Sequence, residues 1–157
     1  MPAPVASTFA SAFPKGEIIE LDAEEENGVM VYDIEFRDGD VEKEADIAAD
    51  GTMLEFSVVI AEKSVTSAAM GALRQAAAGA TIERIERVQV SCEAREGKVI
   101  WLPKRVTLYE ALLSSGEEHA EVVVSSVGDV IEAPMWDEGD EAQPEEEEED
   151  TDKDASE

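Results

Sequence analysis

The sequence contains two similar stretches, and this internal repeat restricts the fold more than any other feature. Residues 29–56 align with residues 106–133 without a gap. The glycines of the two stretches separate alternating apolar and polar runs, and they pair as Gly39 with Gly116 and Gly51 with Gly128. Glycine accepts the positive φ that tight turns between strands require. The repeat therefore predicts two copies of one strand–turn–strand pattern.

Each copy begins with a predicted helix. Val5, Phe9 and Phe13 recur every four residues before the first set of strands, as on one face of a helix. An Ala-rich segment, in which Leu73 aligns with Phe9, precedes the second set. The number of residues that separates aligned positions of the two copies is smaller for the helices than for the paired glycines. The second copy therefore carries an insert between its helix and its later strands, which we place at about 93–105.

The predicted order of elements is one helix followed by four strands, twice. One helix for every four strands can cover only one face of a sheet, and antiparallel sheets tolerate this arrangement. We therefore predict an α+β fold in which tandem α-β-β-β-β repeats form an antiparallel sheet with the helices on one face and an open opposite face. The expected repeats are 3–62 and 63–136, the second with the insert at about 93–105.

The charge of the chain limits its partners. It has 39 acidic and 12 basic residues, a formal net charge of -27. Nucleic acid and anionic membranes attract positive charge, so neither is expected as a partner. No apolar run approaches the ~20 residues of a membrane-spanning helix. Residues 137–157 are predicted to be a disordered acidic tail, because such a segment repels itself and buries little apolar surface. Weak binding of divalent cations by this tail is an open alternative to a purely solubilising function.

The sequence offers little to a catalytic or metal site. His119 is the only histidine, and it has no nucleophile motif nearby. Cys92 is the only cysteine and lies beside Glu93, whose charge disfavours a reactive thiolate. Carboxylates are too abundant for any pair to be diagnostic, and no EF-hand spacing or phosphate-binding loop is present. We predict no catalytic residues, no metal ligands and no cofactor.

The two copies resemble PepSY-like units. The resemblance lies in the positions of the turns, the strand alternation and a Tyr shared by both copies. The residues that carry it are 13–18, 27–36 and 50–55 in the first copy, and 104–110 and 128–132 in the second. The tandem arrangement is similar to the PepSY-like family related in fold to the β-lactamase inhibitor protein. This resemblance implies an exported, non-enzymatic protein, periplasmic or secreted, with a helix-backed sheet. No secretory signal opens the given sequence, so a cytoplasmic location is the alternative.

The insert is the first candidate binding surface. Trp101 and Leu102 are flanked by Lys104 and Arg105, and aromatic and Arg side chains are favoured at the centres of interfaces. A second interpretation is that the insert lengthens a strand and that Trp101 packs into the core.

The open sheet face is the second candidate. The predicted register turns Val31 and Thr107, together with Val29 and Leu112, away from the helices. The sequence thus predicts a non-catalytic protein-binding module, for which the resemblance suggests inhibition of a protease or another exported enzyme. The alternatives are an acidic protein that binds divalent cations and a periplasmic structural protein without a tight protein ligand.

Overall fold

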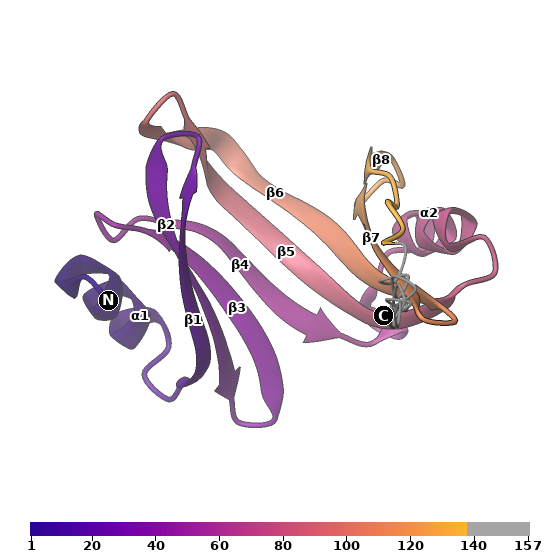
Figure 1. The fold of residues 1–157 in the computed structure, drawn as a ribbon, viewed down its shortest axis with the longest axis horizontal. Coiled ribbons are helices and arrows are strands. Elements are labelled where there is room, and N and C mark those ends of the chain that lie inside the picture. The colour runs from indigo at the N-terminus through magenta and orange to yellow at the C-terminus, as the bar shows by residue number, and fades with distance from the viewer. Residues whose placement is uncertain (138–157) are drawn as a thin grey trace, which may run out of the picture.

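The protein forms one eight-stranded antiparallel sheet in which the strands follow one another in chain order, from β1 to β8 (Figure 1). A computed structural model describes residues 1–137. The predicted α+β fold with an antiparallel sheet and two helices is confirmed. The predicted disorder of the tail, and cation binding there, concern residues that lie outside the described part of the chain, apart from Asp137.

The elements repeat in the predicted order. The first half contains α1 (Ala3–Ala12), β1 (Glu17–Glu26), β2 (Val29–Asp38), β3 (Val41–Ala48) and β4 (Met53–Ile60). A short 3₁₀ turn (Glu62–Ser64) leads into the second half, which contains α2 (Ser67–Ala77), β5 (Thr81–Arg95), β6 (Lys98–Ser115), β7 (Glu118–Ser125) and β8 (Val130–Glu132). The first residues of α1 and α2, and those of β3 and β7, fall on positions that the sequence repeat aligns. Neither helix has the length and apolar character needed to cross a membrane.

Both helices lie on one face of the sheet, which we call the helix-bearing face. Val5 and Phe9 of α1 pack in a buried cluster with alternate residues of β2 and β3, Ile34, Phe36, Ala45 and Ile47. Leu73 of α2 packs in a second cluster with Tyr109 and Val122. Phe56 contacts the first cluster and Ile60 the second, and they share a face of β4 because strand side chains alternate.

A hydroxyl group ties each helix to the turn between the third and fourth strands of its own repeat. Thr8 Oγ1 donates a hydrogen bond to the carbonyl of Gly51 at 2.7 Å, and Thr66 Oγ1 donates one to the carbonyl of Ser126 at 2.7 Å. Thr66 also caps α2 by accepting from the Ala69 amide at 3.3 Å. The two repeats therefore place their helices by equivalent contacts.

The sheet curls toward its other side, the helix-free face, so that the tips of two hairpins meet (Figure 1). The Gly97 amide donates to the Asn27 carbonyl at 2.8 Å, and Asn27 Nδ2 donates to the Ala94 carbonyl at 3.1 Å. A third buried cluster lies beneath this contact and contains Val31, Ala48, Leu54 and Cys92. Val31 is 1% exposed, so its predicted place on an accessible binding surface is wrong. It does face away from the helices, but the curl of the sheet covers it.

The predicted insert lengthens the hairpin of β5 and β6. Val90 lies opposite Val106 and Cys92 lies opposite Trp101, so β6 carries a bulge at residues 102–105. Of the two interpretations of this segment, strand extension is therefore correct. Packing of Trp101 into the core is wrong, because its side chain is 68% exposed.

Candidate binding groove and the acidic sheet face

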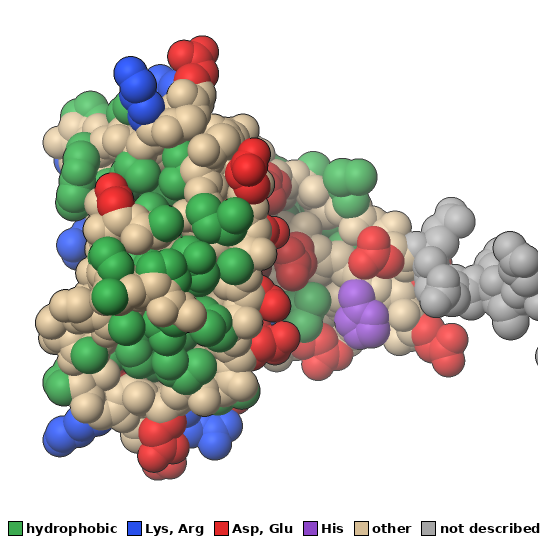
Figure 2. All heavy atoms as spheres, turned by 60° about the vertical axis from the view of Figure 1, so that its left-hand side comes forward, with side chains coloured by type: hydrophobic (Ala, Val, Ile, Leu, Met, Phe, Trp, Pro, Cys, Tyr) green, Lys and Arg blue, Asp and Glu red, His purple; other side chains and the backbone are tan. Residues whose placement is uncertain are grey.

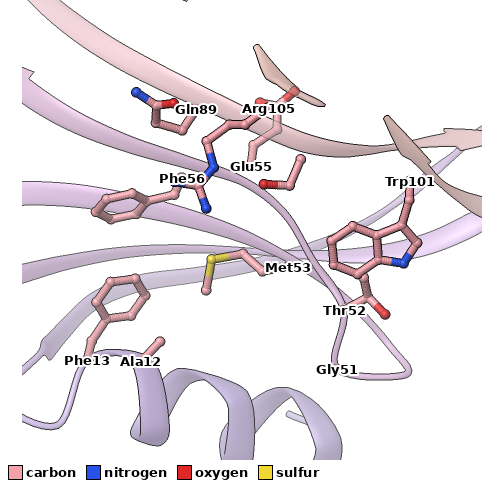
Figure 3. Close-up of a pocket in the computed structure, with 11 residues that line it drawn as sticks. Ala12, Phe13, Gly51, Thr52, Met53, Glu55, Phe56, Gln89, Trp101 and Arg105 are labelled. Carbon is pink, nitrogen blue, oxygen red and sulfur yellow. The ribbon is translucent and has the colours of Figure 1, made fainter. Parts of the chain in front are cut away.

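An apolar groove of about 490 Å³ opens on the helix-bearing face, between the end of α1 and the bulged part of β6 (Figure 3). Its apolar lining comes from three segments that are distant in sequence: Phe13 after α1, Met53 and Phe56 in β4, and Trp101 in β6. The rings of Phe13 and Phe56 stack with their centroids 5.1 Å apart. Large apolar side chains around an open cleft are typical of ligand and protein-binding sites.

A few polar groups complete this groove. Gln89 of β5 and Arg105 of β6 line it, and Figure 3 shows the Arg105 side chain extending toward Phe56. Among residues 1–137, no carboxylate lies within ion-pairing distance of Arg105. Glu55 of β4 also borders the groove, although the register of β3 and β4 assigns its side chain to the helix-free face. Burial and then the charges of Glu26 and Glu132 raise the pKa of its carboxyl. The groove therefore combines an apolar wall with a cation that no described carboxylate neutralises.

The structure brings together some of the predicted binding residues and separates others. Trp101 and Arg105 line the groove together. Leu102, which is half-buried, and Lys104, which is exposed, lie between them in the bulge, and the described residues that line the groove do not include them. Thr107 lies on the helix-bearing face, because its hydroxyl donates to Gln89 Oε1 at 3.2 Å. The prediction that Thr107 belongs to the open face is therefore wrong.

The opposite wall of the groove was not predicted from the sequence. Phe13 was predicted to lie on the face of the first helix that packs against the strands, and Met53 and Phe56 were not named as binding residues. The position of Trp101 opposite them depends on the irregular register of β6. Thr107 could have been placed correctly. It lies two residues before Tyr109, and residues two apart in a strand share a face.

The helix-free face is covered by carboxylates, and we call this set the acidic face. In Figure 2, carboxylates line one border of the surface on which apolar side chains are prominent. Strand alternation and register place on the acidic face Glu20, Asp22, Glu24, Glu26, Asp33, Glu35, Glu42, Glu44, Asp46, Glu55, Glu86, Glu110, Glu121 and Glu132. Among the described residues, two ion pairs involve this set, Arg37 with Glu42 at 3.5 Å and Arg84 with Glu86 at 3.6 Å. The face therefore carries many more carboxyl groups than cations that could neutralise them.

The carboxylates of the acidic face form rows across the strands. One row pairs Asp22 with Asp33, Asp33 with Asp46, and Asp46 with Glu55 in successive strand pairs. A second row pairs Glu20 with Glu35 and Glu35 with Glu44. Like charges directly opposite one another destabilise a sheet. The arrangement therefore lowers stability whenever both members of a pair are ionised.

Burial and mutual repulsion make several of these groups weak acids. Burial is the largest cause of the raised pKa of Glu44, to about 8, and Asp33 is the next. Burial and then Glu55 raise the pKa of Asp46 to about 8. Burial and then Glu121 raise the pKa of Glu110 to about 7. These carboxyls therefore keep protons at a pH where exposed carboxyls are ionised.

Asp33, Glu44 and Asp46 form the tightest cluster of the acidic face, with one carboxylate oxygen of each within 4.8 Å of the others. Asp33 Oδ1 and Asp46 Oδ1 are buried without a hydrogen-bond partner. Burial and then Glu35 raise the pKa of Asp33, and a hydrogen bond with Glu44 opposes this rise. The cluster can hold shared protons.

The groove and the acidic face occupy a fold that occurs in other proteins. The sequence matches no protein-family model and no curated protein sequence. The structure is similar to that of a DUF2874 family protein from Bacteroides uniformis, with a TM-score of 0.61 and 12% identity over 85% of this chain and 88% of that one. It is also similar to a BLIP-like protein from Bacteroides fragilis, with a TM-score of 0.55 and 13% identity over 87% of this chain and 86% of that one.

A third similar structure is that of a Bacteroides eggerthii protein whose name suggests a periplasmic location. Its TM-score is 0.63, with 10% identity over 86% of this chain and 88% of the neighbour. At these identities the likeness concerns the fold. The chain therefore has the fold of BLIP-like and DUF2874 proteins, and its membership of the PepSY-like family stays a prediction.

Proposed function

We propose that this chain is a non-catalytic protein-binding module that receives an apolar segment of its partner in the groove beside Trp101. One observation carries the proposal: an indole that is 68% exposed borders an apolar cleft instead of packing into the core. Exposed large aromatic side chains beside apolar pockets are the usual centres of binding energy in interfaces. Arg105 at the same groove supplies a second anchor of the type enriched at such centres.

The rest of the helix-bearing face supports the same function. Phe13 packs in the aromatic group of α1 and β2, with its ring centroid 4.5 Å from that of Phe36, so one wall of the groove is fixed to the core. Gln89 is held by its hydrogen bond with Thr107. A preformed groove binds more tightly because little ordering is needed on association.

The structural neighbours support a binding function and suggest its form. One neighbour is BLIP-like and another has a name that suggests the periplasm. If the likeness extends to function, the partner is an exported enzyme such as a protease, and binding inhibits it. Periplasmic or secreted location is part of this proposal.

Photo-crosslinking tests the binding function. A photoreactive phenylalanine analogue at position 101 is compared with the same analogue at Val127, which is 72% exposed on another part of the surface. We expect a partner from the source organism to crosslink at position 101 and not at position 127. Purified, this partner should bind the wild type, and Arg105→Glu should weaken binding at least tenfold, whereas Arg74→Glu should not. Equal crosslinking at both positions, or equal affinity of both Arg variants, would contradict the proposal.

Inhibition needs a separate measurement, because binding does not require it. The rate of the identified partner, or of purified exported hydrolases, is measured with increasing wild-type protein and with the Arg105→Glu variant. An inhibitor should lower the rate at stoichiometric concentrations, and the variant should not. Unchanged rates at saturating protein would restrict the function to binding.

A calcium titration by calorimetry distinguishes protein binding from the alternative function, binding of divalent cations. The wild type is compared with a variant carrying Asp33→Asn and Glu44→Gln, which lacks two carboxylates of the tightest cluster. Saturable, stoichiometric heat in the wild type alone would favour the cation function. Equal, weak heats in both proteins would leave protein binding as the supported function.

A further inference from the structure

The outer edge of β1 is long and accessible. Nine of the ten residues of β1 are exposed, and β2 pairs with only one side of the strand. The opposite end of the sheet differs, because its last strand, β8, has three residues. Unpaired amide and carbonyl groups along an edge strand are a template for another extended chain. The molecule therefore offers one extended edge on which a further strand can form.

The side chains of β1 give this edge a distinct chemistry. Six of its ten residues are acidic and none is basic: Glu17, Glu20, Asp22, Glu24, Glu25 and Glu26. Glu20 and Asp22 end the two rows of carboxylates that cross the acidic face. On the other side of the strand, Ile18 and Leu21 pair with Phe36 and Ile34 and are 43% and 38% exposed. The edge thus alternates between an acidic side and a partly apolar side.

We propose that the edge of β1 binds a basic, extended segment of a partner protein by strand addition. Backbone hydrogen bonds would extend the sheet. Lys or Arg side chains on one side of the added strand would lie beside Glu20, Asp22 and Glu24, at the end of rows in which carboxylates face carboxylates. Apolar side chains on its other side would cover Ile18 and Leu21. The proposal concerns a surface distinct from the groove and does not depend on the function of the groove.

Charge selects this occupant over a second copy of the chain. Pairing of two β1 edges would set acidic strands against each other, and like charges directly opposite are unfavourable. A cationic strand would instead neutralise the ends of the rows, and the net charge of -27 would speed its approach. Edge strands are commonly protected by charge, Pro, a bulge or short length. β1 is ten residues long and has no Pro, and its protection consists of six carboxylates and a bulge between Ile18 and Glu20. This protection repels acidic or apolar strands but not a basic one.

Synthetic peptides test the proposal with the full-length protein. The probe is a ten-residue peptide of alternating Lys and Val, matched in length to β1. The control peptide has the same sequence and charge but carries N-methyl groups on its four central residues, which removes N–H donors from both of its edges. Affinity is measured by fluorescence anisotropy at about 0.15 M salt, where longer-range attraction is screened. Amide hydrogen exchange then reports protection of β1.

Two variants with equal net charge locate the site. Asp22→Lys with Glu24→Lys reverses charges in β1. Glu117→Lys with Glu118→Lys, which we call the turn variant, does so in the turn before β7 and at the first residue of β7. We expect the parent peptide to bind the wild type at least tenfold more tightly than the N-methylated peptide and to slow exchange in β1. This preference should persist in the turn variant and disappear in the β1 variant.

Three results would overturn the proposal. Equal affinity of both peptides would show that binding depends on charge alone. Equal effects of both variants on peptide affinity would place the peptide elsewhere on the surface. Slower amide exchange outside β1, and not within it, would exclude strand addition at this edge. Analytical ultracentrifugation monitors the β1 variant, which should stay folded because Lys at position 22 would face Asp33. A wild-type dimer that this variant dissociates would identify a second copy as the occupant, against our proposal.

Discussion

A Cβ atom built on Gly51 would lie 2.9 Å from the carbonyl oxygen of Pro4, so the turn between β3 and β4 touches the backbone of α1. The second repeat has the equivalent contact, because a Cβ on Gly128 would lie 2.8 Å from the carbonyl oxygen of Ala68 in α2. Both glycines have a φ of +92°. Glycine is therefore needed at both turns for conformation and for space.

Gly51→Ala is expected to lower the free energy of unfolding by about 2–4 kcal/mol, from left-handed strain of ~1–2 kcal/mol and from overpacking against the helix backbone. Gly39→Ala is the matched control, since Gly39 has a φ of +65° but nothing within 4 Å of an added Cβ. It should lose only the conformational part, about 1–2 kcal/mol. Urea unfolding measures both. Equal losses would show that the contact with α1 contributes nothing.

Val31 tests the covered part of the helix-free face. Val31→Ala removes two methyl groups from the cluster beneath the meeting hairpin tips and should cost about 2 kcal/mol of unfolding free energy. Val127→Ala, at a residue that is 72% exposed, should change stability by less than about 0.5 kcal/mol. Thermal and urea unfolding report both variants. A neutral Val31→Ala would mean that the hairpin tips separate in solution.

Trp101 should be dispensable for folding. Trp101→Ala is expected to change the free energy of unfolding by less than about 1 kcal/mol, because most of the indole is in solvent. Phe36→Ala should cost about 3–5 kcal/mol, because Phe36 is fully buried against α1. Acrylamide quenching of the wild type and of Trp101→Phe separates the emission of Trp101 from that of Trp136. Strong destabilisation by Trp101→Ala would assign the indole to the core and remove the basis of the proposed groove.

Local patterns in the sequence predict much of the fold. Asn27 and Gly28 take φ values of 45° and 83°, as a tight hairpin requires, and the repeat spacing places both helices. Alternation also places Val31 on the helix-free face. It cannot predict the burial of Val31, because that depends on a contact between hairpin tips that are distant in sequence.

The candidate sites were less predictable than the fold, for two physical reasons. The groove depends on a bulge in β6, where the side of the strand that Trp101 occupies no longer follows from alternation. The raised pKa values of the acidic face depend on burial and on which carboxylates meet across strands. Glu44 and Asp33 meet only through the register of β2 and β3, which no local motif encodes.

Glu44 and Asp46 lie two residues apart on β3, on the acidic face, and both have a pKa raised to about 8. In the unfolded chain their pKa values return to about 4. The folded protein therefore binds more protons than the unfolded chain between about pH 4 and pH 8, and stability falls as pH rises through this window. Glu110, with a pKa raised to about 7, acts in the same direction.

We therefore expect the melting temperature to be higher at pH 5.5 than at pH 9, by roughly 5–10 °C. Circular dichroism at constant ionic strength measures this difference, and added salt should raise the melting temperature at pH 9 by screening the repulsion. Glu44→Gln with Asp46→Asn should flatten the pH profile by stabilising the protein at pH 9, because neutral groups then replace carboxylates whose ionisation opposes folding. Glu117→Gln, in an exposed turn, should leave the profile unchanged. A melting temperature that rises with pH, or an equally steep profile in the double variant, would mean that these carboxyls ionise freely in the folded protein and that the rows on the acidic face carry no repulsion.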